Sequence, residues 1–406
     1  MEGAYLAEEH IVAGLDLGTS KVSVVIAAID SQGINRIMGV GTGSHSGMHR
    51  GAIMDPESVA AAIMEAVIKA ERMAAIQMPP PVMGIPGVHT SSFAAMGAVD
   101  IRRPSHRVQA GDIERALSAA KSRAVPPGRP VVYQSVRAFA LDGSQVDGEP
   151  EGAVARTLEL DAQFVTVALP LLESYLDCLS RAGIEVKEIV VQCLAAADMA
   201  LAPSHRKLGV VLVDFGAGLT EIALFRSSRL QHLSTLPVGA DNLARDLTVG
   251  LRISLEEAER LVQGLGCNPW SAESSTWGKL AGEVAASEKY NQVFMARAEE
   301  IWQLVGDEIA KVGVGLAWPA GLKLVGGGAM IPGFADLGAK ILDMPVEVVI
   351  PSDVPGLPDG LQGPVSAAVM GLVQHQVRGL VTTADRSGQP GAFKGLWQKV
   401  RDWLRF

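Results

Sequence analysis

One strand–turn–strand pattern occurs twice in this chain of 406 residues. Its two copies are IVAGLDLGTSKVSVVIAAI, from Ile11 to Ile29, and LGVVLVDFGAGLTEIALF, from Leu208 to Phe225. Each copy opens with a short apolar run rich in β-branched residues, which predicts a buried strand. Each run then passes through an aspartate and a turn of small residues into a second apolar strand. The rest of the chain is organised around these two predicted hairpins.

The two aspartates, Asp16 and Asp214, lie where the first strand of each hairpin ends. The glycines after them let successive N–H groups point at a phosphate, because no Cβ blocks the approach. A carboxylate that faces phosphates needs a cation between them, so both aspartates are predicted to anchor hydrated Mg²⁺ through water. The residues predicted to contact the phosphates are Gly18, Thr19, Ser20, Lys21, Gly216, Gly218 and Thr220. The alternative is two ordinary glycine hairpins in a hydrophobic core.

A third glycine motif follows another predicted strand in GLKLVGGGAMIPGF. Gly326, Gly327 and Gly328 leave a surface without side chains, which an adenine or a ribose can approach closely. Alone, this motif is a weak signal. Together with the two hairpins it predicts the third wall of a nucleotide cleft, and it disfavours the ordinary-core alternative.

The composition limits the class of protein. With 48% hydrophobic and 19% charged residues, the chain can bury large cores and should form more than one domain. Its net charge of −9 argues against nucleic acid as a partner, because phosphate backbones require clustered lysine and arginine. Cys178, Cys193 and Cys267 follow no metal-binding spacing and are expected to be reduced thiols of a cytosolic protein. The sequence shows neither a signal peptide nor an apolar run of membrane-spanning length.

Local signals predict where several helices begin and end. Asp55 is expected to cap a helix with Pro56 at its first position, and Gly183 is expected to end another. Ser254 and Glu257 form a capping box for a third helix. A long helical pattern covers 283–312, with inward positions at Val293, Ala296, Ile301, Leu304 and Ile309.

Three other features allow more than one interpretation. The loop that carries His45, His49 and Arg50 is compatible with a metal or anion site, but a solvated or interface loop is favoured because no further ligands lie nearby in sequence. Residues from Met83 to Phe164 read as short strands around one helix and suggest a contact surface rather than chemistry. Gln192, where a strand ends and a helix begins, either orients an attacking water or forms a hydrogen bond in the core; the latter is slightly favoured.

The chain reads as a linker after Gln376 and then as a helix from Phe393 to Phe406. At about 1.5 Å per residue this helix spans roughly 21 Å, too short to cross a hydrocarbon core of about 30 Å, so it is expected to lie on the membrane surface. Its apolar stripe is Phe393, Leu396, Trp397, Val400, Trp403 and Leu404, flanked by Lys394, Lys399, Arg401 and Arg405. The alternative is that the helix docks on its own globular body or on a partner.

The three glycine motifs, in this order, resemble those of the actin, Hsp70 and sugar-kinase superfamily. Within it the chain closely resembles the FtsA family, actin-like bacterial division proteins that tether the tubulin-like FtsZ to the inner membrane. The resemblance covers almost the whole chain and depends on GLDLGTSKV, GSHSGMHRGAIMD, ADMALAPSHRKLGVVLVDFGAGLTEIALF, LPVGADNLARDLTVGLRISLEEAERL, LVGGGAMIPGF and the C-terminal amphipathic helix.

This resemblance implies an α/β fold with two actin-like lobes around ATP, an inserted subdomain 1C and a C-terminal amphipathic helix. The expected parts are an N-terminal tail at 1–10, subdomain 1A at 11–82 and 165–206, subdomain 1C at 83–164, subdomain 2A at 207–238 and 319–378, subdomain 2B at 239–318, a linker at 379–390 and a membrane-targeting helix at 391–406. It further implies that Glu259 contacts the ribose and that Gln192 lies where the family orients a water. Leu219, Glu221 and Val262 depart from the family pattern.

The implied cofactors are ATP and Mg²⁺, with weak or no ATPase activity. The implied partners are the FtsZ C-terminal peptide, further copies of the chain in filaments, anionic lipids and other division proteins through subdomain 1C. The implied place is the cytoplasmic face of the inner membrane, peripherally, at the division site. The alternatives are a pilus-assembly scaffold resembling PilM and, less favoured, a sugar or acetate kinase of the same fold.

Overall fold

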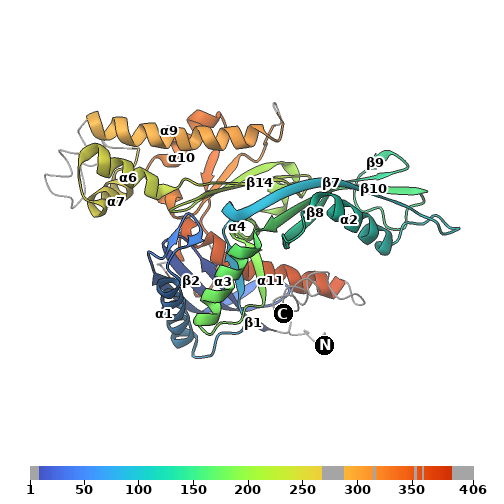
Figure 1. The fold of residues 1–406 in the computed structure, drawn as a ribbon, viewed down its shortest axis with the longest axis horizontal. Helices are drawn as coiled ribbons and strands as arrows, with labels where there is room; N and C mark the ends of the chain where they lie inside the picture. The colour runs from blue at the N-terminus through green and yellow to red at the C-terminus, as the bar shows by residue number, and fades with distance from the viewer. Residues whose placement is uncertain (1–8, 268–287, 314–316, 352–353, 359–360, 386–406) are drawn as a thin grey trace, which may run out of the picture.

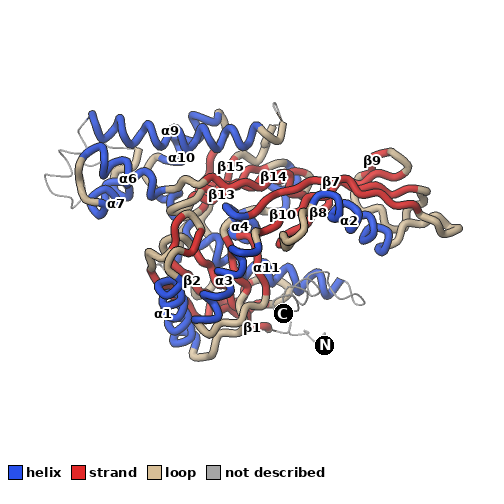
Figure 2. The backbone as a smooth tube through the Cα atoms, in the orientation of Figure 1, coloured by secondary structure: helices blue, strands red, loops and turns tan. Residues whose placement is uncertain are grey.

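The computed structural model describes residues 9–267, 288–313, 317–351, 354–358 and 361–385. In this part of the chain, two five-stranded sheets form the centres of two lobes, and a four-stranded antiparallel sheet forms a separate module (Figure 1). The first lobe lies at the bottom of the view, the second lobe at the top, and the module projects to the right (Figure 2). The α/β class predicted from the sequence is confirmed.

The sheet of the first lobe has the order β11-β6-β1-β2-β3. Its strands are β1, His10–Leu17; β2, Lys21–Ile29; β3, Ile34–Ser44; β6, Val82–Ile85; and β11, Glu188–Val191. The first three pair antiparallel, whereas β6 runs parallel to both β1 and β11. Helices α1, Pro56–Ala74, and α3, Leu169–Arg181, pack on one face, and α11, Ala367–Asp385, packs on the other. A small hairpin, β4, Met48–His49, and β5, Ala52–Ile53, precedes α1.

Alternate glycines of β3 bring α1 unusually close to the sheet. A Cβ on Gly41 would lie 1.8 Å from the carbonyl oxygen of Ala66, and Gly39 and Gly43 make the same approach to neighbouring turns of α1. Any larger residue would push the helix off the strand. The glycines of β3 therefore set the spacing between α1 and the sheet.

The sheet of the second lobe has the order β14-β13-β12-β15-β16. Its strands are β12, Val210–Phe215; β13, Thr220–Arg226; β14, Arg229–Leu236; β15, Leu322–Val325; and β16, Val346–Val348. One face is covered by α6, Ala240–Leu251; α7, Leu255–Gly264; α9, Glu288–Ala310; and α10, Phe334–Leu342. The rings of Phe215 and Phe334 stack there at 4.5 Å between centroids, and Trp302 lies 4.9 Å from Phe334. The other face packs against α4, Gln192–Ala200, while α5, Pro203–Leu208, contacts β13.

The module inserted between the two parts of the first lobe has the strand order β7-β10-β8-β9 and one helix. Its elements are β7, Thr90–Asp100; α2, Ala110–Ala124; β8, Val131–Leu141; β9, Ser144–Val146; and β10, Thr157–Val167. The predicted texture is confirmed, but the predicted bounds are wrong at both ends. Met83 lies in β6 of the first lobe, because that strand pairs with β1, and β10 continues beyond Phe164 to Val167. A 3₁₀ turn, Gly87–His89, leads into the module.

Most local predictions are confirmed. The side chain of Asp55 accepts a hydrogen bond from the backbone of Ser58 at 3.1 Å, and Ser254 and Glu257 cap each other reciprocally. Gly183 follows α3 with a φ of 71°. Both predicted hairpins are present, β1 with β2 and β12 with β13. The three cysteines are free thiols, two of them buried.

The predicted inward face of α9 is rotated. Ile301 and Ile309 are buried as expected and Val293 and Leu304 are partly buried, but Ala296 is exposed. The large aromatic residues decide the face, since Tyr290, Phe294 and Trp302 are fully buried. The helix turns these rings into the core because they bury the most apolar area.

The C-terminal part of the described chain belongs to the first lobe. The predicted subdomain 2A was to extend to residue 378, yet α11 packs on β1, β2 and α4. Leu357 and Leu361, which precede it, enter the same core. The helix also continues to Asp385, so the predicted linker is wrong for 379–385. Residues 386–390 of that linker and the predicted membrane helix lie outside the described residues.

Among the helices of the described ranges, none has both the length and the apolar character needed to span a bilayer.

Candidate functional site

A cavity of about 140 Å³ lies between the turns of the two hairpins, the start of α4 and the third glycine motif. Most of the predicted site residues line it, namely Asp16, Gly18, Thr19, Ser20, Lys21, Gln192, Asp214, Gly216, Gly326 and Gly327. Gly218, Thr220, Gly328 and Glu259 are not among the described residues that line it. The cavity is smaller than the roughly 300 Å³ at which small-molecule sites usually begin. This volume has room for phosphate groups and a hydrated ion.

The turn of the first hairpin is closed by a hydrogen bond from the Gly18 nitrogen to the Lys21 carbonyl, at 3.0 Å. The loop that carries His45 packs against this turn from outside. The backbone nitrogen of His45 donates to the Ser20 carbonyl at 3.1 Å, and the ring nitrogen Nε2 of His45 lies 3.1 Å from the Gly18 carbonyl. The described residues contain no group of three or more His, Cys, Asp or Glu side chains that could hold a metal directly. Here His45 supports the turn of the first hairpin.

The turn of the second hairpin has the same closure, from the Gly216 nitrogen to the Leu219 carbonyl at 2.9 Å. The two turns approach each other closely, because a Cβ on Gly218 would lie 3.0 Å from the side chain of Thr19. The structure does not place the Thr220 side chain at the predicted phosphate contact. Thr220 is fully buried, and its hydroxyl donates to the carbonyl of Val238 at 2.8 Å.

Three carboxyl groups line the cavity, and among the described residues no ion pair neutralises all three. Burial raises the pKa of Asp16 to about 6, although the Lys21 ammonium and a hydrogen bond from Gln192 lower it. Burial and the charge of Asp16 raise the pKa of Asp214 to about 7. Burial and the charge of Asp214 hold the pKa of Glu221 well above its usual range. A divalent cation among these groups would remove the repulsion between their ionised forms.

Lys21 is the ammonium group that lines the cavity, half-buried at the end of the first turn. Burial lowers its pKa, while the charge of Asp16 raises it. One positive charge does not balance Asp16 and Asp214 once both are ionised, and Glu221, whose pKa is held well above its usual range, is a third carboxyl group beside them. The cavity thus has the electrostatics expected of a site completed by a cation and an anionic ligand.

Gln192 occupies the first position of α4 and is 6% exposed. Its amide nitrogen donates to the Asp16 carboxylate at 2.7 Å and to the Leu17 carbonyl at 2.9 Å. The side chain both lines the cavity and forms hydrogen bonds in the core. Its amide oxygen is the atom left to contact a water in the cavity.

The third glycine motif fits closely against the second hairpin. Gly326 has a φ of 88°, and a Cβ there would lie 2.4 Å from the Asp214 carboxylate. Gly328 packs on the ring of Phe215, where a Cβ would lie 2.3 Å away, so this glycine serves the core. Glu259 is exposed on α7. Its predicted ribose contact stays a prediction.

Sequence reasoning missed the contact that Glu221 makes across the cleft. This residue of β13 is 5% exposed, and its carboxyl accepts a hydrogen bond from the Gly87 nitrogen at 2.6 Å. Gly87 begins the turn that leads into the inserted module. A charged residue within the apolar run TEIALF was the available signal. Its long-range partner could not be read from the sequence.

Comparisons with known proteins agree with this geometry. A family profile described as Cell division protein FtsA matches residues 211–371, and a profile described as SHS2 domain inserted in FTSA matches residues 87–166, the inserted module. Cell division protein FtsA of Pseudomonas aeruginosa is 30% identical over 380 residues, which cover 90% of this chain and 89% of that protein. The corresponding protein of Bacillus subtilis is 30% identical over 376 residues, covering 91% and 84%.

Solved structures with similar folds include the PilM-PilN type IV pilus biogenesis complex, with a TM-score of 0.62, 17% identity and coverage of 90% of this chain and 98% of that one. MreB5 of Spiroplasma citri bound to ADP aligns with a TM-score of 0.53 at 12% identity, covering 93% and 99%. At these identities the similarity establishes the fold alone. That fold is the actin-like ATPase fold.

Proposed function

Because this chain belongs to the FtsA family of cell division proteins, we propose that it binds ATP with Mg²⁺ between its lobes and tethers FtsZ filaments to the inner membrane. In this proposal it acts as a scaffold that polymerises at the division site, and the nucleotide fixes the angle between the lobes. The observation that carries the nucleotide part is the pair of facing hairpin turns with Asp16 and Asp214 at one cavity.

Asp16 and Asp214 would hold Mg²⁺ through water, because this ion prefers oxygen ligands and keeps part of its hydration shell. Backbone N–H groups of Gly18 to Ser20 and of Gly216 would face the phosphates, with Lys21 as a point charge beside them. The cation supplies the positive charge that the buried carboxylates lack.

Hydrolysis is expected to be slow or absent. A general base must accept a proton, and an amide is a poor base. The amide nitrogen of Gln192 already donates to Asp16 and Leu17, so this side chain can only orient a water through its oxygen. Nucleotide then acts through differential binding to lobe arrangements rather than through turnover.

The attachment to the membrane rests on the sequence of the C-terminal residues 391–406. Their apolar stripe and four basic residues suit an anionic bilayer surface. Single molecules would bind reversibly, whereas a filament with many tails would bind tightly through avidity. Head-to-tail self-association would involve the inserted module, and the FtsZ C-terminal peptide is the proposed cytoskeletal partner.

Two measurements test the proposal. Mg-ATP should raise the melting temperature of the wild-type chain by mass action, and Lys21→Ala should reduce that rise. Lys207→Ala, an exposed lysine on α5, is the matched control and should respond like the wild type. Equal responses of all three proteins would place nucleotide elsewhere.

The partner is tested by co-sedimentation with FtsZ filaments. The wild-type chain should pellet with FtsZ and not with FtsZ that lacks its C-terminal peptide. Pelleting that is independent of this peptide would contradict the tethering role, whatever the nucleotide result.

A further inference from the structure

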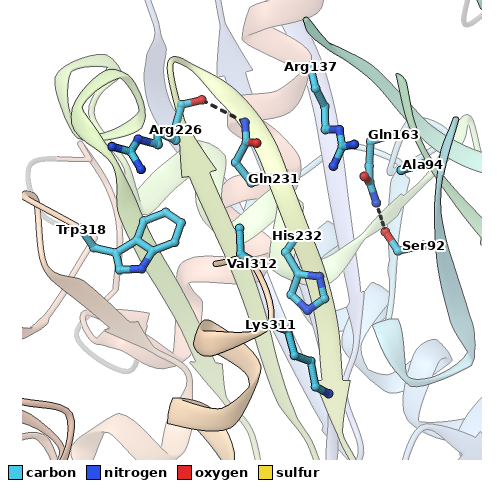
Figure 3. Close-up of a pocket in the computed structure, with 10 residues that line it drawn as sticks. All are labelled: Ser92, Ala94, Arg137, Gln163, Arg226, Gln231, His232, Lys311, Val312 and Trp318. Atoms are coloured by element: carbon cyan, nitrogen blue, oxygen red, sulfur yellow. Dashed lines mark hydrogen bonds between the residues drawn. The ribbon is translucent and has the colours of Figure 1, made fainter. Parts of the chain in front are cut away.

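A second cavity, of about 400 Å³, lies where the inserted module meets the second lobe. It shares no lining residue with the nucleotide cleft. Figure 3 shows Arg137 and Gln163 of the module on one side, His232 of β14 in the middle and Trp318 on the far side. Lys311, just past the end of α9, and Arg226, at the end of β13, complete the polar lining. Three parts of the chain that are distant in sequence thus build one pocket.

The lining is positively charged. Arg137, Arg226 and Lys311 contribute cations, and no Asp or Glu is among the described residues that line the cavity. The carboxylates that pair with these cations stand outside the lining. Asp161 accepts from Arg137 at 2.6 Å, and Glu308 pairs with Lys311 and, at 3.2 Å, with His232.

Two donors in this pocket lack acceptors. Arg226 has no ion pair or side-chain hydrogen bond within the described ranges; only its carbonyl is engaged, by Gln231 at 3.3 Å. The Nε atom of Arg137 is buried without a hydrogen-bond partner among the described residues. Buried donors in folded proteins almost always find an acceptor. With Asp161 and Glu308 balancing two of the three cations, Arg226 leaves a surplus of one positive charge.

We propose that this pocket binds a small organic oxyanion, a molecule that carries phosphate or carboxylate groups. The cavity falls within the range of roughly 300 to 1,000 Å³ that small-molecule sites occupy. Arginine guanidinium groups match the planar geometry of carboxylates and phosphates. The anion contacts Arg226, whose guanidinium points away from Arg137 and lies on the same side of the pocket as Trp318 (Figure 3), and the side of Trp318 supplies an apolar wall for the body of the molecule.

A ligand at Arg226 lies on the second-lobe side of the junction with the module. Without it, described contacts between them include the Arg229 guanidinium, which donates to the Val136 carbonyl at 3.0 Å and lies 5.4 Å from the ring centroid of Phe139. Arg229 belongs to β14, and Val136 and Phe139 belong to β8, so both contacts lie where these two strands meet. Occupation of the pocket adds a charge-assisted bond to Arg226 beside this junction.

The test uses the full chain with inorganic pyrophosphate in one arm and citrate in the other, followed by titration calorimetry. Binding that Arg226→Gln weakens is expected in either arm. The arm with the larger Arg226-dependent part identifies the phosphate or the carboxylate class, because pyrophosphate can also enter the nucleotide cleft. Arg226→Gln should weaken binding at least about tenfold, since a hydrogen bond to a charged group contributes about 1.5 to 3 kcal/mol. Arg226→Lys should retain part of it. Arg72→Gln, an exposed arginine of α1, controls for the change in overall charge.

Amide hydrogen exchange locates the effect. The anion should slow exchange at the ends of β13 and β14 beside Arg226 in the wild type, and not in Arg226→Gln. General stabilisation by excluded salts acts on all variants alike, so only the difference between variants counts. Failure of both anions to bind, or equal binding to wild type and Arg226→Gln, overturns the proposal. The comparison of wild type with Arg226→Gln does not bear on nucleotide in the other cleft, because Arg226 does not line that cleft.

Discussion

Replacing Asp214 by asparagine should make the nucleotide-free protein more stable at pH 8 and should also weaken its response to Mg-ATP. Asp214 lies beside Asp16 and Glu221 at the cavity, and burial together with the charge of Asp16 raises its pKa from a usual value near 3.8 to about 7. The ionised carboxylate is therefore unfavourable in the folded state. Asparagine has a similar shape and no charge, so it removes that cost.

The magnitude follows from the pKa. A change from 3.8 to about 7 corresponds to about 4 kcal/mol of folding free energy. Asp214 is only partly shielded from solvent, which reduces the cost, and we expect a gain of roughly 2 kcal/mol at pH 8.

The gain depends on pH in a defined direction. A carboxyl whose pKa is raised by folding binds more protons in the folded state than in the unfolded state between the two pKa values, so stability falls as the pH rises through that interval. Below about pH 4 both states of the wild type are protonated, and Asp214→Asn should match it. The advantage of the variant then grows with pH and levels off above the folded pKa of about 7.

Urea unfolding followed by circular dichroism, with EDTA present, measures this difference at pH 5 and at pH 8. Asp307→Asn, an exposed position on α9, is the control and should leave stability unchanged. Mg-ATP should then stabilise the wild type by about 2.7 kcal/mol at a hundredfold excess over its Kd and Asp214→Asn by less. An apo variant that is no more stable than wild type at pH 8, or a gain of equal size at pH 5, would refute the reasoning.

Three further outcomes are expected. Gly41→Ala should destabilise the chain by about 1 to 3 kcal/mol or more, because the added Cβ would lie 1.8 Å from the Ala66 carbonyl oxygen. Gly111→Ala is the control, since nothing lies within 4 Å of its added carbon. In thermal unfolding this control should be neutral or slightly stabilising. Flotation with liposomes should require the C-terminal residues. The wild type should float, whereas Trp397→Glu and a chain that ends at Gln389 should not, and high salt should weaken flotation of the wild type. Equal flotation of all three proteins would eliminate the membrane anchor. Electron microscopy on lipid monolayers with Mg-ATP should show filaments, and isolated particles at high protein concentration would count against self-association.

The features that were predicted correctly from the sequence are those that depend on short stretches of the chain. The cap at Asp55 and the capping box of Ser254 depend on residues three positions apart, and both hairpins depend on one turn each. Asp16 and Asp214 were correctly expected at the same cavity, because each terminates a buried strand before a glycine turn. These are cases in which local chemistry leaves few alternatives.

What could not be predicted depends on contacts between distant segments. Thr220 was expected at the phosphates, but the carbonyl of Val238 takes its hydroxyl. The residues after Gln376 have weak periodicity, yet they continue α11, which docks on the first lobe. The bond from Gly87 to Glu221 joins residues 134 positions apart. No local pattern encodes these partners, since each is created only when segments separated in the sequence pack together.

Helix α4 connects the nucleotide cleft to helix α11 through side-chain contacts. Its first residue, Gln192, holds the Asp16 carboxylate and the Leu17 carbonyl of the first hairpin. Farther along, Asp198 pairs with His375 of α11 at 3.3 Å and also with Arg378.

Between these contacts the two helices touch through their backbones. A Cβ on Gly371 would lie 1.9 Å from the Ala195 carbonyl, so sliding of one helix over the other is strongly opposed. Helix α11 ends at Asp385, and the predicted tail follows it. A ligand that displaces Asp16 or Gln192 must therefore either break the contacts of α4 or move α11 with it, and the close packing of the two helices favours the second.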